Sequence, residues 1–515
     1  SRKPVEVETC ATATSKLKDG SHKTILSIEF NKKYVAKTSM SIIPNPTEWQ
    51  VNEWMMDPKF TSEAFLKQLL PAQISPEGID LWRKILGRSD RPTFITVSGS
   101  TFSCDSQSIL ARNRYPHLQK LYKHHCPEWP TVNMLLSECF YLMNDICGAR
   151  IHAQKAQGQV GIGHDIVLDQ CIVFLKECEM ESMKEYEEEN EEGDTSSVYR
   201  RPAQYFSSSQ PSNLIALQLR WHTMKRTHDG AEQFVRLACV QTNELEGVFD
   251  LDGDSTMKLT RCGLYANSIE GISQTSRQKK KGKILEILKN TERCFNKVKN
   301  ECLQNESPSS SITEEFFKII HELLLGGNNI EMEETEDDTL MCMYIPGGRY
   351  RGGPSYTSHE DENGKKHTTC YCPAADLDKE MQWLVENVKE ILSFTNIDPF
   401  RACAWIQFSF VRIHPFADGN GRVSRLLSSI PLILNDLPPV YVSKASKPKY
   451  LRALIAADTS GDIDDLANFL QQEVFDALGL LLDYNDIDME KVSIQKVSDI
   501  AASSSDEFDN EHNEA

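Results

Sequence analysis

The sequence lacks any apolar run that approaches the length of about 20 residues needed to cross a bilayer. No secretory hydrophobic segment follows its first residues. It also lacks an excess of positive charge, because 75 acidic side chains outnumber 56 lysines and arginines and leave a net charge of −19. These absences argue against a membrane protein and against a nucleic-acid binder.

Paired cysteine spacing is also missing, since none of the 15 cysteines forms a C-x-x-C pair. Cysteines such as Cys139, Cys147, Cys171 and Cys403 are scattered through apolar runs. This distribution is typical of buried thiols in a reducing compartment, so we expect a cytoplasmic or nuclear protein. Because the chain starts at Ser1 and not at Met, an N-terminal signal ahead of it stays open.

Two patterns that suggest metal binding are incomplete. Cys370-Tyr371-Cys372 lies near His367, but a second ligand pair at zinc spacing is missing. The acidic stretch 250–254 resembles a calcium loop, but Arg261 stands where a bidentate glutamate is needed. We therefore predict no zinc or calcium site from these segments.

One short stretch between two apolar segments stands apart from the rest. Apolar residues recur at helical spacing over 399–412 and again over 422–434, which predicts two buried helices. The stretch that joins them reads His414-Pro415-Phe416-Ala417-Asp418-Gly419-Asn420-Gly421-Arg422. Gly421 and Arg422 open the second helix, whose N-terminus offers backbone N–H groups and a positive dipole end to an anion.

The residue types in this stretch suit a polyphosphate and its metal. Gly419 and Gly421 let the backbone approach phosphate oxygens. Asp418 is a hard oxygen ligand suited to Mg²⁺. Arg422 and Arg425 lie three residues apart, so both guanidinium groups face one end of a triphosphate.

Two further residues complete the chemistry of the stretch. His414 is a base that can take a proton from an attacking hydroxyl near neutral pH. Asn420 carries an amide that can position phosphate oxygens. Each of these residues alone is more often a turn or a surface residue, but their combination between two apolar helices favours a nucleotide-binding catalytic site.

This stretch resembles the signature of the Fic family, His-Pro-Phe-x-(Asp/Glu)-Gly-Asn-Gly-Arg-x-x-Arg, without a departure. The resemblance implies a mainly α protein: a helical Fic domain with a small β-hairpin flap, behind a mixed α/β N-terminal region. It implies transfer of AMP from Mg-ATP to a protein hydroxyl, with His414 as base and Asp418 as Mg²⁺ ligand. The phosphates would be held by Gly419, Asn420, Gly421, Arg422 and Arg425.

The domain boundaries follow from the resemblance and from composition. We expect an unassigned region over 1–200, a helical region over 213–300, the Fic domain over 301–482 and an acidic, disordered tail over 484–515. In the first region, 23–30 and 92–97 read as strands, and 134–156 and 166–186 as helices. The serine- and proline-containing segment 193–213 reads as a linker.

A hairpin is predicted ahead of the signature. β-prone runs flank Asn363-Gly364, a strong turn signal. Gly348-Arg349-Tyr350-Arg351 resembles the segment that enters the family's target-binding flap. The resemblance implies that the segment from Tyr356 to Tyr371 docks a target strand by main-chain pairing. An ordinary solvated loop is an equally good interpretation of these residues.

The family's inhibitory pattern, (Ser/Thr)-x-x-x-Glu-(Gly/Asn), occurs at Thr242 to Gly247. Thr242 and Glu246 lie one turn apart on an amphipathic helix that Gly247 ends. The resemblance implies that Glu246 pairs with Arg425 and blocks the γ-phosphate site. Glu270, followed by Gly271, is a second candidate, but Ala266 stands where Ser or Thr is expected.

We therefore predict an autoinhibited protein adenylyltransferase that modifies a Ser, Thr or Tyr hydroxyl. One alternative is the reverse reaction, in which AMP is removed from a modified protein. Another is a non-catalytic interaction protein that acts through its N-terminal region. ATP and a target protein are the expected partners, and a homodimer is possible by resemblance to the family.

Overall fold

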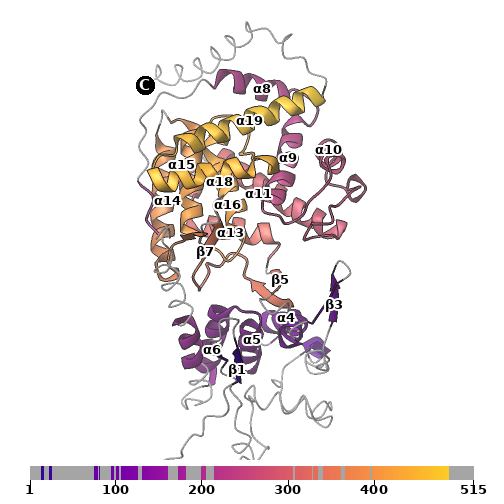
Figure 1. Ribbon diagram of the computed structural model, residues 1–515, viewed down its shortest axis with the longest axis vertical. Coiled ribbons are helices and arrows are strands. Elements are labelled where there is room, and N and C mark those ends of the chain that lie inside the picture. Colours follow the sequence, from indigo (N-terminus) through magenta and orange to yellow (C-terminus); the bar gives the residue numbers. More distant parts are fainter. Residues whose placement is uncertain are drawn as a thin grey trace, which may run out of the picture. The chain divides into compact units, whose positions relative to one another are not determined.

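The structure is a computed structural model, and Figure 1 shows its elements along the chain. It describes residues 13–16, 22–25, 75–78, 80–81, 94–97, 100–103, 106–125, 130–160, 172–180, 199–203, 214–304, 308–327, 329–334, 340–360, 366–394 and 397–485. These residues divide into two compact units, one formed mainly by the first 175 residues and one by the remainder. Each unit is described by itself.

The first unit is built on helices α4 (Ser106–His124), α5 (Pro130–Leu142) and α6 (Ile146–Val160). It also contains the hairpin of β1 (Ala13–Lys16) and β2 (His22–Ile25). α4 packs against α5.

The prediction of one helix over 134–156 is wrong, because α5 ends at Leu142 and α6 begins at Ile146. Asn144 between them has a φ of 59°, a left-handed conformation that a continuing helix does not tolerate. Asparagine adopts that conformation more readily than most residues.

The other N-terminal predictions are covered only in part. The strand predicted over 23–30 coincides with β2 as far as Ile25, and the rest lies outside the described residues. The strand predicted over 92–97 appears as β3 (Phe94–Val97), which pairs with β4 (Ser100–Ser103) within the second unit. Of the helix predicted over 166–186, residues 172–180 are helical and the others lie outside the described residues.

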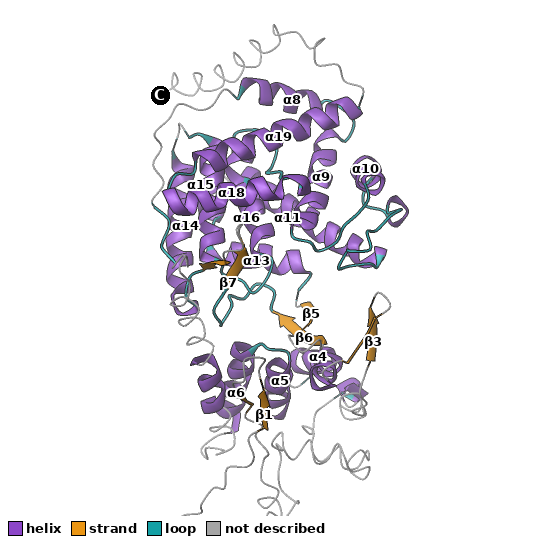
Figure 2. Cartoon of the chain, viewed as in Figure 1, coloured by secondary structure: helices purple, strands orange, loops and turns teal. Residues whose placement is uncertain are grey.

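The second unit is mainly helical, as predicted (Figure 2). One hydrophobic core runs through it from Leu217 to Leu482. Before the flap come α8 (Ile215–Lys225), α9 (Gly230–Leu245), α10 (Gly253–Cys262), α11 (Lys281–Gln304), α12 (Pro308–Ser311) and α13 (Glu314–Leu325). After it come α14 (Leu377–Ser393), α15 (Pro399–Ile413), α16 (Asn420–Ser428), α17 (Ile430–Leu434), α18 (Lys447–Ser460) and α19 (Asp464–Tyr484). Short 3₁₀ turns cover Ala266–Ser268, Ala374–Asp376 and Lys444–Ser446.

Helix α15 is the centre of this unit. Thirteen of its 15 residues are buried, and α14, α16, α17 and α19 pack around it. Its start is defined by Asp398, whose side chain accepts hydrogen bonds from the backbone N–H groups of Phe400 (2.9 Å) and Arg401 (3.1 Å). Pro399 occupies the first turn, where its missing N–H costs nothing. A helix enclosed in this way holds the loop that follows it in a fixed position.

Two antiparallel hairpins lie between α13 and α14. The flap consists of β7 (Tyr356–Glu360) and β8 (Lys366–Cys370), with Tyr356 opposite Cys370. The predicted hairpin is therefore present, although its Asn363-Gly364 turn lies outside the described residues. A second hairpin pairs β5 (Asn329–Glu334) with β6 (Leu340–Ile345). Sequence analysis did not identify it, because the acidic residues of β5 disfavour a strand.

The described part of the predicted linker is attached to the second unit. The Tyr199 hydroxyl donates to Glu380 (2.9 Å), which also forms an ion pair with Arg201. The Trp405 indole N–H donates to the carbonyl of Ala203 (2.8 Å). Residues 199–203 therefore follow α14 and α15 across their surface.

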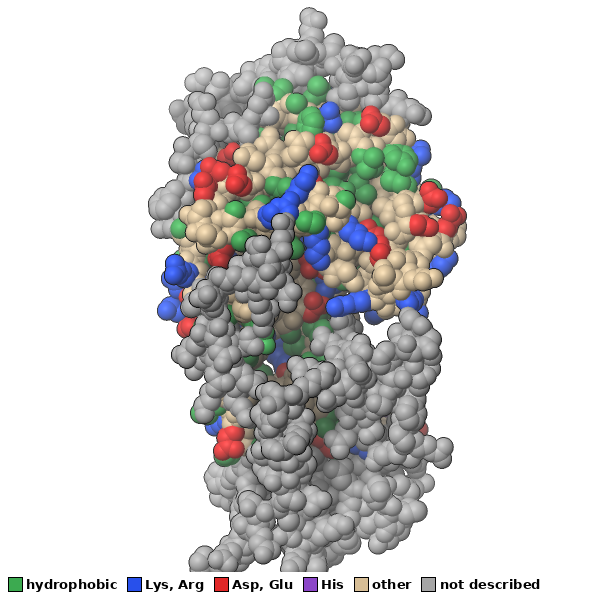
Figure 3. Space-filling view, viewed as in Figure 1, with side chains coloured by type: hydrophobic (Ala, Val, Ile, Leu, Met, Phe, Trp, Pro, Cys, Tyr) green, Lys and Arg blue, Asp and Glu red, His purple; other side chains and the backbone are tan. Residues whose placement is uncertain are grey.

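Two further features concern the helices and the surface of the described residues. In the described part of the chain, no helix has both the length and the apolarity that crossing a bilayer requires. On the face drawn in Figure 3, lysines and arginines are interspersed with acidic side chains among the described residues.

Candidate active site

The signature residues form the turn between α15 and α16. His414 ends α15 in a left-handed conformation with a φ of 51°, and its N–H donates to the Phe410 carbonyl (2.9 Å). Gly419, with a φ of 78°, directly precedes α16, which starts at Asn420. The first N–H groups of α16 have no acceptor within their own helix. The loop therefore brings a histidine and a helix N-terminus to one place.

Asn420 shapes this loop from within. Its side-chain oxygen accepts from the N–H of Phe416 (2.9 Å), and its amide nitrogen donates to the carbonyl of Phe416 (2.7 Å). The residue is only 2% exposed. Its side chain thus closes the turn, and its backbone N–H remains at the helix N-terminus.

His321, on α13, supports the same loop from the other side. Its ring stacks on Phe416 with centroids 3.7 Å apart. The N–H of Gly348 donates to its Nδ1 (2.9 Å), so its Nε2 carries the proton and donates to the Asp418 carbonyl (3.0 Å). Burial lowers the pKa of His321 to about 4, which keeps the ring neutral.

His414 is held as a neutral base. Its Nδ1 lies 3.2 Å from the Val411 carbonyl. A carbonyl can only accept, so Nδ1 carries the proton and Nε2 keeps its lone pair. Burial, and next the charge of Arg351, lowers the pKa of His414 to about 4. At neutral pH the ring is therefore unprotonated and able to accept a proton.

Asp418 and Arg422 form an ion pair of 2.7 Å across one turn. Burial raises the pKa of Asp418, but Arg422 and the N–H of Gly419 lower it by more, so the carboxylate stays ionised. Among the described residues no cluster of three His, Cys, Asp or Glu side chains could hold a metal. A single carboxylate suits Mg²⁺, which keeps waters and shares substrate phosphates.

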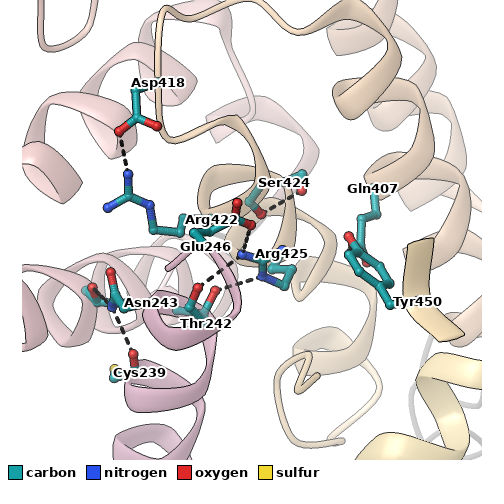
Figure 4. Close-up of polar contacts among 12 residues, drawn as sticks. Cys239, Thr242, Asn243, Glu246, Gln407, Asp418, Arg422, Ser424, Arg425 and Tyr450 are labelled. Carbon is teal, nitrogen blue, oxygen red and sulfur yellow. Dashed lines mark hydrogen bonds and ion pairs between the residues drawn. The ribbon is translucent and has the colours of Figure 1, made fainter. Parts of the chain in front are cut away.

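Arg425 is enclosed by the predicted inhibitory segment. Its Nε donates to the Thr242 hydroxyl (2.7 Å), and its Nη2 lies 2.5 Å from Oε1 of Glu246. Figure 4 shows Arg425 between these two residues, with Arg422 turned toward Asp418. Burial raises the pKa of Glu246, but the charge and hydrogen bond of Arg425 outweigh it and lower the pKa overall.

The Glu246 carboxylate also covers the start of α16. A Cβ atom added at Gly421 would lie 2.2 Å from Oε1 of Glu246. The carboxylate therefore rests on the backbone of the helix N-terminus, where an anion is most favoured. Gly247 has a φ of 69° and ends α9 one residue later, as predicted.

The second candidate, Glu270, lies elsewhere. Its carboxylate pairs with Lys258, and its side chain is 53% exposed. The structure thus assigns the contact with Arg425 to Glu246, which the sequence had left as the first of two choices.

Two guanidinium groups keep unused donors at the site. Nε of Arg422 and Nη1 of Arg425 are buried and have no hydrogen-bond partner in the structure. Buried donors without acceptors are costly, so these groups favour a bound acceptor. A polyphosphate that binds at the N-terminus of α16 supplies such acceptors.

Comparison with known proteins places this site in a family. Residues 311–432 match the model of the Fic/DOC family. A Fido domain-containing protein of Dictyostelium discoideum is 37% identical over 83 residues, which are 16% of this chain and 57% of that protein. The protein adenylyltransferase Fic of Culex quinquefasciatus is 42% identical over 72 residues, 14% of each chain. The chain thus spans less than two thirds of the curated relatives that it matches.

A solved structure of a Fic domain containing signaling protein from Bacteroides thetaiotaomicron is similar over 54% of this chain and 99% of that one, with a TM-score of 0.41 and 21% identity. The signature, the helical fold and the family match agree. The family match therefore identifies residues 311–432 of this chain as a Fic/DOC family domain.

Three residues that contact the loop were not predicted to do so from the sequence. His321 and Tyr371 contact the loop from other elements, and Arg351 donates to the His414 carbonyl (2.7 Å). The segment 348–351 had been singled out only for its resemblance to the start of the flap. No spacing rule connects these residues to the loop, because their contacts form only in the folded chain.

Proposed function

We propose that this protein transfers AMP from Mg-ATP to a hydroxyl side chain of a target protein. The observation that carries the proposal is the neutral, partly buried His414 beside a helix N-terminus and two guanidinium groups with unused donors. The adenylyltransferase name of the relative in Culex quinquefasciatus supports it.

The proposed reaction gives each of these residues a role. Nε2 of His414 takes the proton of the target hydroxyl, and the resulting oxygen attacks the α-phosphorus of ATP. A new P–O bond forms to the target, the bond to the bridging oxygen breaks, and pyrophosphate leaves. The N-terminus of α16 and the guanidinium groups of Arg422 and Arg425 hold the phosphates in place. Asp418 would hold Mg²⁺, which neutralises phosphate charge when bound.

The flap supplies the target's position. A target strand that pairs with an exposed edge of the β7–β8 hairpin would bring its Ser, Thr or Tyr hydroxyl toward His414. Main-chain pairing fixes the register of the strand without requiring a particular target sequence. We therefore assign target docking to the segment from Tyr356 to Tyr371.

Glu246 would act as the inhibitor of this reaction. Its carboxylate takes the Nη2 donor of Arg425 and covers Gly421, so it competes with a phosphate for the same groups. Binding of the γ-phosphate then requires displacement of Glu246. The wild-type protein is thus expected to transfer AMP slowly until this contact opens.

The test is intact-protein mass spectrometry after incubation with Mg-ATP, on wild type, Glu246→Gly and Glu246→Gly/His414→Ala. We expect an AMP adduct on the Glu246→Gly protein, a weak adduct on wild type and none on the double variant. An adduct of equal size on the double variant would exclude His414 as the base. Loss of AMP from a previously modified target in wild type, without transfer by any variant, would instead favour the reverse reaction.

A further inference from the structure

The ring of His414 is covered by an aromatic side chain from the flap. Tyr371 follows the last residue of β8, and its ring lies 3.9 Å from the His414 ring, centroid to centroid, with 12° between the planes. The residue is 7% exposed. The two rings therefore stack face to face, although they come from separate elements.

Tyr371 is itself held by the opposite side of the hairpin. Its hydroxyl lies 3.1 Å from the Thr357 hydroxyl on β7, and its N–H donates to the Ser355 carbonyl (3.0 Å). The hydroxyl and the backbone N–H of Tyr371 are thus both tied to the β7 side of the flap. Movement of β7 relative to β8 would displace the tyrosine ring.

Arg351 connects the base of the flap to the backbone of the same histidine. Its guanidinium donates to the carbonyls of His414 (2.7 Å) and Gly353 (2.6 Å), and to that of Cys372. Gly353 precedes the flap and Cys372 follows it. One buried side chain therefore joins both ends of the hairpin to the strained left-handed turn at His414.

The hydrogen bond of Nδ1 to Val411 does not by itself fix the imidazole plane. The χ2 torsion of histidine has a broad range of favourable values, and a single hydrogen bond of 3.2 Å leaves the ring free to rotate within that range. A flat aromatic surface parallel to the ring restricts that rotation. When the His414 ring takes a proton and becomes positively charged, the π electrons of the Tyr371 ring face that charge.

We propose that Tyr371 is a positioning residue for His414, so that the flap that docks the target also sets the plane of the catalytic base. The inference rests on the proposed function. A target strand that pairs with the flap then contacts the same hairpin that orients Nε2 of His414. Through the contacts of Thr357, Tyr371 and Arg351, a shift of the flap on target docking changes the orientation of the His414 ring.

The experiment uses the full chain with Glu246→Gly, to which Tyr371→Phe or Tyr371→Leu is added. Phenylalanine keeps the stack and loses the Thr357 contact, whereas leucine loses the aromatic surface. Tyr441→Leu is the matched control, because Tyr441 is also 7% exposed and packs near Phe234 and not on His414. Activity is measured as kcat and as KM for ATP.

We expect Tyr371→Leu to lower kcat about tenfold or more while KM for ATP changes less than about twofold. Tyr371→Phe should retain most of kcat, and Tyr441→Leu should leave kcat close to that of the parent. A kcat for Tyr371→Leu that matches the parent or the control would overturn the inference.

A spectroscopic measurement separates this inference from the proposed function. In protein labelled with ¹³C-histidine, the His414 ring signals are assigned by their loss in His414→Ala. We expect an upfield ring-current shift that Tyr371→Phe preserves and Tyr371→Leu removes. Unchanged His414 signals in Tyr371→Leu would refute the stack. If the Glu246→Gly parent transfers no AMP, the proposed function fails, and the ring signals still decide the contact.

Discussion

Glu246 places a carboxylate oxygen 2.5 Å from Nη2 of Arg425, although the two residues are 179 positions apart in the chain. The carboxylate comes from the end of α9 and the guanidinium from the last turn of α16. Arg425 is 2% exposed, so its charge depends on partners within the protein. Under the proposed function, this contact would make ATP binding and the position of α9 mutually dependent.

The first prediction concerns ATP affinity. Glu246→Gln keeps the shape of the side chain but removes its charge, so the remaining bond to Arg425 weakens. We expect ATP to bind about tenfold more tightly to Glu246→Gly than to wild type, with Glu246→Gln between them. Isothermal titration calorimetry measures this directly. Glu270→Gln, which alters an exposed carboxylate paired with Lys258, should bind as wild type does. Equal affinities in all four proteins would contradict the inhibitory contact.

The second prediction concerns the close approach at Gly421. A methyl group there would lie 2.2 Å from Oε1 of Glu246, so Gly421→Ala forces the carboxylate away from Arg425. We expect a loss of about 1–2 kcal/mol in unfolding free energy in wild type, and a smaller loss beside Glu246→Gly. Urea denaturation of the four variants measures the difference. Gly282→Ala, a helical position with open space around it, should not destabilise. Equal losses in both backgrounds would mean that Glu246 does not rest on Gly421.

The third prediction concerns the loop itself. Asn420→Ala removes both hydrogen bonds to the backbone of Phe416 and leaves that buried N–H and carbonyl without their partner. We expect a loss of about 2–3 kcal/mol in unfolding free energy. Asn435→Ala, which removes one bond to the Pro431 carbonyl, is the matched control and should cost less. A result in which the two substitutions cost the same would argue that Asn420 does not close the turn.

The fourth prediction concerns stability and pH. The pKa of His321 is lowered to about 4 in the folded protein, whereas the unfolded chain has the ordinary value near 6.5. Between these values the unfolded state binds more protons, so stability falls as pH decreases through this range. We expect His321 to account for roughly 2 kcal/mol of lost stability between pH 7 and pH 5.

Chemical denaturation at several pH values tests this expectation. His321→Gln should be less stable than wild type at pH 7 but should show a shallower dependence on pH. The dependence should not vanish, because the pKa of His414 is lowered to about 4 as well. An unchanged slope in His321→Gln would show that His321 is not held neutral by burial.

The chemistry of the site was readable from the sequence because it is local. Residues 414–425 carry the histidine proposed as base, the carboxylate, the glycines and both arginines in one stretch, and apolar periodicity predicted helical structure on either side. The helix that carries Thr242 and Glu246 was also predicted, since its apolar residues repeat at helical spacing and Gly247 ends it. Local pattern thus predicted the residues and the presence of these helices, but the single helix predicted over 422–434 is wrong, because the chain forms α16 (Asn420–Ser428) and α17 (Ile430–Leu434) there.

The relations between distant segments were decided only by tertiary structure. The spacing rules allowed Glu246 or Glu270 as partner of Arg425, and packing of α9 against α16 selected Glu246. The role of the Asn420 side chain was read as phosphate binding, whereas the folded loop uses it on Phe416. Tyr371 reaches His414 only because the flap returns to the end of α15. Hydrophobic periodicity specifies which face of a helix or strand is buried. Which other element packs against that face depends on the arrangement of all the elements in the core.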